Sequence, residues 1–170
     1  AIEKKLKDKG YARYRVKQED TAESLAGVDG IICTGTFSTS MVKRARSWNC
    51  PVVFIDANPD PVQFDAIVVN YDQAVKELLD YLIACGHKRI GMIGGDELLD
   101  SGELVQDPRA RIFREYLEEK GLYHPEYMKY GDYKPNNGYE LFKEMYRSGN
   151  MPTALFVGND SMASGSYKAA

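Results

Sequence analysis

The sequence predicts an α/β protein of two lobes, each built on a doubly wound parallel sheet. Short apolar runs alternate with segments of helical period along the whole chain, as in successive strand–helix–strand units. Some runs are continuously apolar, the clearest being PVVFI at 51–55, and such runs are typical of strands covered on both faces. A turn-rich stretch at 56–65, which holds two prolines, and the step from Asn70 to Tyr71 after it divide the elements into two groups.

The elements of the first group are short. Apolar runs predict strands, and the segments between them have polar or weakly amphipathic helical patterns. In chain order we expect a strand at 12–16, a polar helix at 19–26, a strand at 28–33, a helix at 39–48, and strands at 51–55 and 66–69.

The second group contains longer helices. The first of them ends at Gly86 and has one apolar stripe, formed by Val75, Leu78, Leu79, Leu82 and Ile83. After it we expect a strand at 89–93, a long acidic loop at 94–108, a helix at 109–121, a strand at 127–130, a helix at 135–149, a strand at 154–157 and a last helix at 161–170.

The natural boundary between the lobes lies after the proline-rich stretch, at the step from Asn70 to Tyr71. Residues 1–70 are then part of an N-terminal lobe, and residues 71–170 are part of a C-terminal lobe. Because the chain opens and closes inside helical patterns, we expect it to be a fragment in which both lobes are incomplete.

Composition excludes several classes of protein. The net charge is −3 and no basic face is readable, so the chain does not have the pattern of a stand-alone nucleic-acid binder. It has no apolar run long enough for a membrane span and no signal-peptide pattern at its start. The cysteines (Cys33, Cys50 and Cys85) are single and widely spaced, which favours buried thiols in a reducing cytoplasm over a metal site. We expect no cofactor and no metal.

Motifs of catalysis are also absent. The sequence contains no GxSxG, no GxxxxGK[ST] and no GxGxxG. His87 follows the glycine that ends a helix, where a role in joining helix to strand is favoured over catalysis. The chain is therefore expected not to be an enzyme, and no catalytic residue is assigned.

Polar residues gather at the predicted strand ends, where ligands of doubly wound sheets bind. Asp56, Arg109, Tyr133 and Asn159 form a set suited to a sugar, because carboxylate, guanidinium and amide groups pair with adjacent hydroxyls and an aromatic ring covers the C–H face. Each position also has a simpler interpretation as turn chemistry or, for Arg109, as a surface residue near a helix start. Asp160 is expected only to cap the last helix.

Several motifs together resemble the effector domain of LacI/GalR-type transcriptional repressors. The resemblance covers nearly the whole chain, and it rests on the stretches VDGII (28–32), PVVFID (51–56), LIACGHKRIGMIGG (82–95), RARIFREYL (109–117) and PTALFVGNDSMA (152–163). It implies a type I periplasmic-binding-protein-like fold. Gly102 and Glu103 ahead of Asp107–Pro108–Arg109 are most similar to the galactose-responsive branch.

The resemblance implies that Asp56, Arg109, Tyr133 and Asn159 bind a small-molecule sugar effector between the lobes. It further implies a homodimer in the cytoplasm whose operator DNA is bound by an N-terminal helix-turn-helix that residues 1–170 do not contain. One departure is Asn70–Tyr71, where Asp–Asn is common in the family, and another effector-binding acid is expected beyond Ala170. Arg109→Ala is expected to abolish the effector response and leave folding intact.

Two other functions stay open at this point. A periplasmic sugar-binding protein of a transporter would share the architecture but carry a secretory signal in place of the helix-turn-helix. An α/β enzyme, such as a sugar-modifying hydrolase, would need a convergent set of acid, base or nucleophile groups that the sequence does not display.

Overall fold

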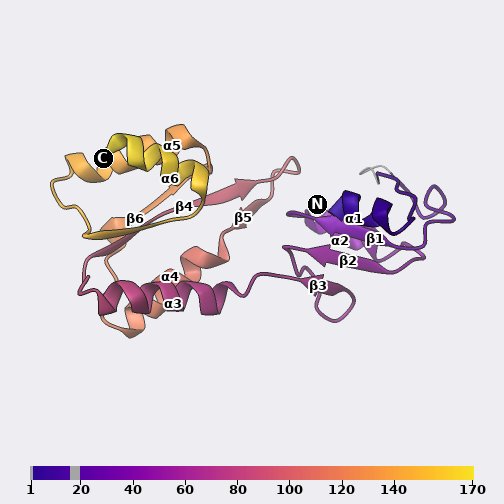
Figure 1. Ribbon diagram of the computed structural model, residues 1–170, viewed down its shortest axis with the longest axis horizontal. Coiled ribbons are helices and arrows are strands. Elements are labelled where there is room, and N and C mark those ends of the chain that lie inside the picture. Colours follow the sequence, from indigo (N-terminus) through magenta and orange to yellow (C-terminus); the bar gives the residue numbers. More distant parts are fainter. Residues whose placement is uncertain (1, 16–19) are drawn as a thin grey trace. The chain divides into compact units, whose positions relative to one another are not determined.

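The computed structural model describes residues 2–15 and 20–170, and the chain divides into two compact units, Ala1–Val68 and Val69–Ala170 (Figure 1). The division falls between the last strand of the first unit and the long helix that opens the second. Mixed α/β architecture with parallel sheets is found in both units, as the sequence predicts. No helix among the described residues is long and apolar enough to cross a membrane.

The first unit is built on a parallel sheet of three strands in the order β1–β2–β3. Ile31 pairs with Val52, and Phe54 pairs with Ala66. Phe54 is 1% exposed, and the rings of Phe37 and Phe64 contact it edge-on at 5.1 Å between centroids. The elements are α1 (Ile2–Asp8), β1 (Ile31–Thr34), α2 (Thr39–Ala45), β2 (Val52–Ile55) and β3 (Asp65–Ile67).

Two short elements expected in this unit are not formed. Residues 11–15 have no strand structure, and residue 16 lies outside the described residues. Tyr11 and Tyr14 are both largely exposed, so this segment has no apolar partner to pack against. Residues 22–27 form hydrogen-bonded turns in place of the polar helix, whose first residue, 19, is also outside the described part. A helix this short is unstable without a broad apolar face.

In the second unit a four-stranded sheet lies between two pairs of helices (Figure 1). The central strand β4 pairs in parallel with β6 on one side and with β7 on the other. The elements are α3 (Tyr71–Ala84), β4 (Ile90–Leu98), β5 (Leu104–Gln106), α4 (Pro108–Glu119), a 3-10 turn η1 (Pro125–Tyr127), β6 (Met128–Gly131), α5 (Pro135–Arg147), β7 (Ala154–Val157) and α6 (Asp160–Ala169).

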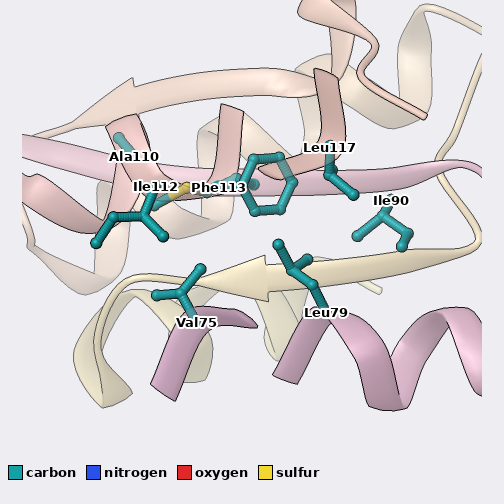
Figure 2. Close-up of a cluster of buried hydrophobic side chains, with 8 residues drawn as sticks. Val75, Leu79, Ile90, Ala110, Ile112, Phe113 and Leu117 are labelled. Carbon is teal, nitrogen blue, oxygen red and sulfur yellow. The ribbon is translucent and has the colours of Figure 1, made fainter. Parts of the chain in front are cut away.

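Alternate residues of β4 supply the two faces of this core. Ile90 and Met92 pack with Val75 and Leu79 of α3 and with the buried residues of α4. Figure 2 shows Ile90 among the side chains of these two helices. Ile93 points the other way and packs with residues that include Met145 of α5 and Met162 of α6. Because both faces are covered, β4 carries buried apolar side chains on both sides of the sheet.

The stretch expected to be a long acidic loop is instead a β-hairpin. β4 continues to Leu98, and β5 pairs with it antiparallel, with Leu98 opposite Leu104. The turn is closed by hydrogen bonds from Leu99 N to Glu103 O (2.9 Å) and from Gly102 N to Leu99 O (2.8 Å). Gly102 has a φ of 82°, a conformation that glycine adopts without strain. The sheet is therefore parallel except at this hairpin.

Candidate ligand site

Three of the four predicted site residues lie together at the carboxyl edge of the second unit's sheet. β4, β6 and β7 all lead into this edge, with Gly95 opposite Gly131 and with Gly158 N bonded to Ile93 O at 2.9 Å. Helices α4, α5 and α6 begin just beyond these strand ends. Arg109, Tyr133 and Asn159 stand at or beside the three helix starts, so parallel topology brings residues far apart in sequence to one place.

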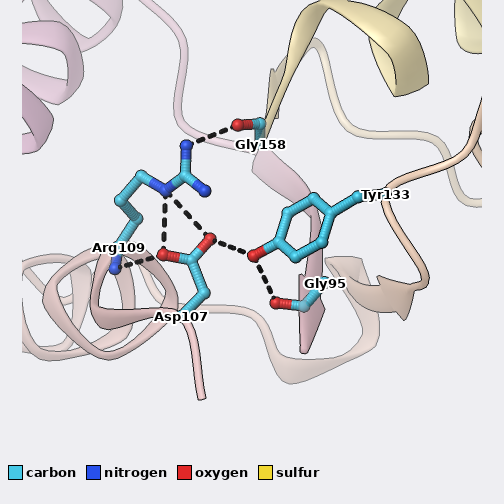
Figure 3. Close-up of polar contacts among 5 residues, drawn as sticks. All are labelled: Gly95, Asp107, Arg109, Tyr133 and Gly158. Atoms are coloured by element: carbon cyan, nitrogen blue, oxygen red, sulfur yellow. Dashed lines mark hydrogen bonds and ion pairs between the residues drawn. The ribbon is translucent and has the colours of Figure 1, made fainter. Parts of the chain in front are cut away.

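Arg109 is held by a buried carboxylate two residues before it. The side chain of Asp107 is 2% exposed and accepts hydrogen bonds from Arg109 Nε at 2.8 and 2.9 Å, one to each oxygen (Figure 3). It also caps α4, accepting from Arg109 N at 2.9 Å, and Pro108 occupies the first turn. Nη1 of Arg109 donates to Gly158 O, so the guanidinium is also hydrogen-bonded to the backbone just after β7.

The environment keeps Arg109 charged. Burial alone lowers the pKa of Arg109, but the hydrogen bond and charge of Asp107 outweigh it and raise that pKa above its ordinary value. The guanidinium carbon also lies 5.2 Å from the ring centroid of Tyr71 and 6.0 Å from that of Tyr133. Both distances are within the range of a cation–π attraction. The side chain is therefore fixed by charge, hydrogen bonds and rings together.

Tyr133 crosses the ends of two strands. Its hydroxyl lies 2.6 Å from Gly95 O and 2.9 Å from Asp107 Oδ2, so its single hydrogen is shared between two acceptors (Figure 3). A Cβ atom at Gly95 would lie 3.0 Å from the phenol ring, which shows that the ring rests directly on this glycine. Tyr133 has a φ of 61°, an uncommon left-handed conformation for a bulky residue.

Asn159 fixes that conformation and caps α6. Its Oδ1 accepts from Met162 N at 2.8 Å, and its Nδ2 donates to Tyr133 O at 3.2 Å. The expectation that Asp160 caps this helix is therefore wrong, since Asp160 is the first residue of α6 and Asn159 is the cap. The cap is one residue earlier because Asn159 has the extended backbone conformation that a capping residue needs.

Asp56, the fourth predicted residue, belongs to the first unit. It is exposed, follows β2 with a φ of 68°, and donates its backbone N–H to Ile67 O at 2.9 Å. Asn70, another polar residue at a predicted strand end, caps α3 by accepting from Gln73 N at 3.2 Å. The cluster of the second unit thus contains Arg109, Tyr133 and Asn159, but neither of these two residues.

Asp107 is the member of the cluster that sequence reasoning missed. It contacts Arg109 and Tyr133 and is almost completely buried. Asp followed by Pro directly before an amphipathic segment is a typical helix start, so the sequence held a signal for its capping role. The same signal does not reveal the contact with Tyr133, which lies 26 residues away.

The buried hydroxyl of Tyr133 leads to a pH prediction. Burial, and then the hydrogen bond and charge of Asp107, raise the pKa of Tyr133 well above its ordinary value. Below about pH 10 both the folded and the unfolded chain keep the phenol proton, and above it only the unfolded chain loses it readily. The free energy of unfolding is therefore expected to fall as the pH rises above about 10.

Tyr133→Phe should make this decline shallower, as measured by urea unfolding at a series of alkaline pH values. The control is Tyr146→Phe, which changes an exposed tyrosine of α5 and should preserve the decline. Equal pH profiles for the two variants would contradict the assignment of the decline to Tyr133.

The chemistry available in the cluster is hydrogen bonding. It presents N–H donors, a phenol, an amide, a carboxylate and carbonyl oxygens. The Tyr133 hydroxyl contacts the Asp107 carboxylate, but the pKa of Tyr133 is raised, so the contact does not activate the phenol as a nucleophile. Among the described residues, no group of three or more His, Cys, Asp or Glu side chains is arranged to hold a metal ion.

Comparison with known proteins gives a consistent result over the whole chain. Residues 2–170 match the family described as "Periplasmic binding proteins and sugar binding domain of LacI family". The chain is 33% identical over 144 residues to the HTH-type transcriptional regulator GalR of Streptococcus thermophilus, covering 84% of this chain and 44% of the regulator. It is 34% identical over 149 residues to the HTH-type transcriptional repressor MelR of Bacillus subtilis, covering 84% of this chain and 42% of the repressor.

A solved structure of a sugar-binding transcriptional regulator of the LacI family from Escherichia coli, complexed with phosphate, has the same fold. Its TM-score is 0.78 at 18% identity, over 99% of this chain and 63% of that chain. The present chain spans less than half the length of the two curated relatives, which are transcriptional regulators and not enzymes. The predicted fold and the predicted relationship are both confirmed, and the chain belongs to the family of periplasmic binding proteins and LacI-type sugar-binding domains, as part of a LacI/GalR effector-binding domain.

Proposed function

We propose that this chain is the effector-sensing part of a sugar-responsive transcriptional repressor. A galactose-like sugar binds between the two lobes and changes the affinity of the repressor for its operator. The observation that carries the proposal is the convergence of Arg109, Tyr133 and Asn159 at the carboxyl edge of one sheet, held by Asp107. The relatives named GalR and MelR support a regulator of this type.

The chemistry of the cluster suits a sugar. A guanidinium has five N–H donors in a planar fork, and the bonds to Asp107 and Gly158 use two of them, so donors remain for adjacent hydroxyls. Tyr133 offers an aromatic surface, and aromatic rings pack well against the C–H face of a sugar ring. Because these side chains are already held by hydrogen bonds, binding a sugar costs little further ordering. Asp56 of the first unit completes the proposed set.

The proposed switch follows from the energetics of two states. A sugar shifts the balance between two lobe arrangements only by the difference in its affinity for them. We propose that the regulator is a cytoplasmic homodimer and that operator DNA is contacted by a helix-turn-helix outside residues 1–170. A change in lobe arrangement then alters the spacing of the two DNA-binding heads and relieves repression.

The alternative of a periplasmic sugar-binding protein is less well supported, because the two curated relatives are transcriptional regulators. A catalytic role is also less well supported, because the pKa of Tyr133, whose hydroxyl contacts the Asp107 carboxylate, is raised and the phenol keeps its proton.

The test is calorimetric titration of the intact regulator that carries this chain with a panel of sugars. Galactose or a galactoside is expected to bind and to weaken the binding of operator DNA in a parallel mobility-shift assay. Glucitol, an open-chain polyol, is the control for non-specific effects. Absence of binding by every cyclic sugar in the panel would contradict the proposal.

A further inference from the structure

The positive charge of Arg109 is neutralised from within the protein. Its Nε donates to both oxygens of Asp107, and the side chains of the two residues are 22% and 2% exposed. An arginine in a ligand site normally favours anionic groups, because its fork matches carboxylate and phosphate oxygens. Here a carboxylate of the chain already occupies part of that fork, so the pair has no net charge.

Each of the three helices that begin at the cluster also has an aspartate of the chain at or near its N-terminus. Asp107 caps α4, and Asp132 accepts from Lys134 N at 3.1 Å where α5 begins. Asp160 is the first residue of α6. Helix N-termini favour anions, but each of these three already has a carboxylate beside it. Lys134, the nearby cation, is paired with Asp132 at 2.7 Å.

We propose that Asp107 is a specificity-determining residue that makes this site select neutral sugars over sugar phosphates. The inference rests on the proposed function and adds to it the chemical class of the effector. A phosphate group at Arg109 would lie close to the Asp107 carboxylate and would be repelled by it. A neutral hydroxyl accepts from the donors of Arg109 that remain and meets no such repulsion.

Asp107 also acts through Tyr133. Its Oδ2 lies 2.9 Å from the Tyr133 hydroxyl, so one carboxylate orients both the guanidinium and the aromatic ring. Loss of the negative charge therefore has two expected effects on binding. A neutral sugar binds more weakly because its partners are less well positioned, and an anionic sugar binds relatively better because the arginine charge is no longer cancelled.

The test measures the affinities of the intact regulator for galactose and galactose 6-phosphate, and for glucose and glucose 6-phosphate, by calorimetry. One of the two sugars will bind the wild-type protein better than the other. That neutral sugar is expected to bind at least about tenfold more tightly than its own 6-phosphate, which is the scale of one unfavourable charge contact. Asp107→Asn is expected to reduce this preference by about tenfold or more, through weaker binding of the sugar and stronger binding of the phosphate.

The matched control is Glu115→Gln. Glu115 pairs with Arg111 on the same helix as Arg109, but both side chains are exposed, so its replacement should leave the preference unchanged. Asp107→Ser is a second variant that removes the charge and keeps an oxygen able to cap α4, so it tests the charge if Asp107→Asn fails to fold. Folding of each variant is verified by its urea unfolding transition.

If the wild-type protein binds the phosphate esters more tightly than the neutral sugars, the inference is wrong, but the proposed function as a sugar sensor is not contradicted. Equal losses for both ligand classes in Asp107→Asn or Asp107→Ser would also overturn it, because Asp107 would then have only a structural role. Absence of binding of all four ligands to the wild-type protein would contradict the galactose-like effector and this inference together.

Discussion

Replacing Arg109 with alanine is expected to lower the free energy of unfolding of the second unit by about 2 to 3 kcal/mol, as well as to remove sugar binding. The side chain of Asp107 is 2% exposed, and the change leaves its carboxylate without a counter-ion. This loss of stability is smaller than is usual for breaking a fully buried ion pair, because the Arg109 side chain is 22% exposed and Asp107 keeps its capping bond from the backbone N–H. The sequence alone predicted that Arg109→Ala would abolish the effector response and leave folding intact. The ion pair with Asp107 adds a second expected effect, a lower free energy of unfolding.

Urea unfolding of the chain without sugar measures this cost, and calorimetry measures the loss of binding. In Asp107→Asn/Arg109→Ala the buried charge is gone, so the double variant is expected to be more stable than Arg109→Ala alone. The control is Arg111→Ala on the same helix, whose exposed pair with Glu115 contributes little to stability. If Arg109→Ala is as stable as Arg111→Ala, the ion pair does not stabilise the fold.

Replacing Gly165 with alanine is expected to destabilise the second unit by about 3 kcal/mol or more, the upper end for an overpacked core. Helices α5 and α6 cross so closely that a Cβ at Gly165 would lie 1.8 Å from Pro135 O. A Cβ at Gly138 would lie 2.1 Å from Met162 O. Both clashes are with backbone oxygens, so a change of rotamer cannot relieve them and the helices must separate.

Separation of these helices should also weaken the candidate site. α5 begins just after Tyr133 and α6 just after Asn159, and the bond from Asn159 Nδ2 to Tyr133 O joins the two starts. Urea unfolding and sugar titration of Gly165→Ala are expected to show both losses. Ser164→Ala, at the neighbouring exposed position of α6, is the control and should be close to wild type. Equal stability of the two variants would contradict the close helix crossing.

The longer elements could be predicted because their patterns decide them locally. The apolar stripe of α3, which includes Val75 and Leu79, is set by spacing alone, and both residues are buried as expected. β4 was likewise expected as a strand at 89–93, and its residues Ile90, Met92 and Ile93 are fully buried. The short elements could not be predicted in this way. Residues 11–15 and 22–27 have too few apolar partners to be fixed by pattern, and the β4–β5 hairpin depends on pairing across a turn.

The sequence by itself determined that Arg109, Tyr133 and Asn159 would lie near the carboxyl edge of the sheet, because a parallel α/β pattern places the residues that follow the strands along one edge. Only the tertiary structure decided which of these residues contact one another, and that the charge of Arg109 is paired with the buried Asp107 carboxylate. Asp107 reaches Tyr133, and Asn159 reaches the Tyr133 carbonyl, across 26 residues each. Such contacts depend on the register of β4, β6 and β7 and on the backbone angles at three helix starts, neither of which is encoded in the spacing of residues along the chain.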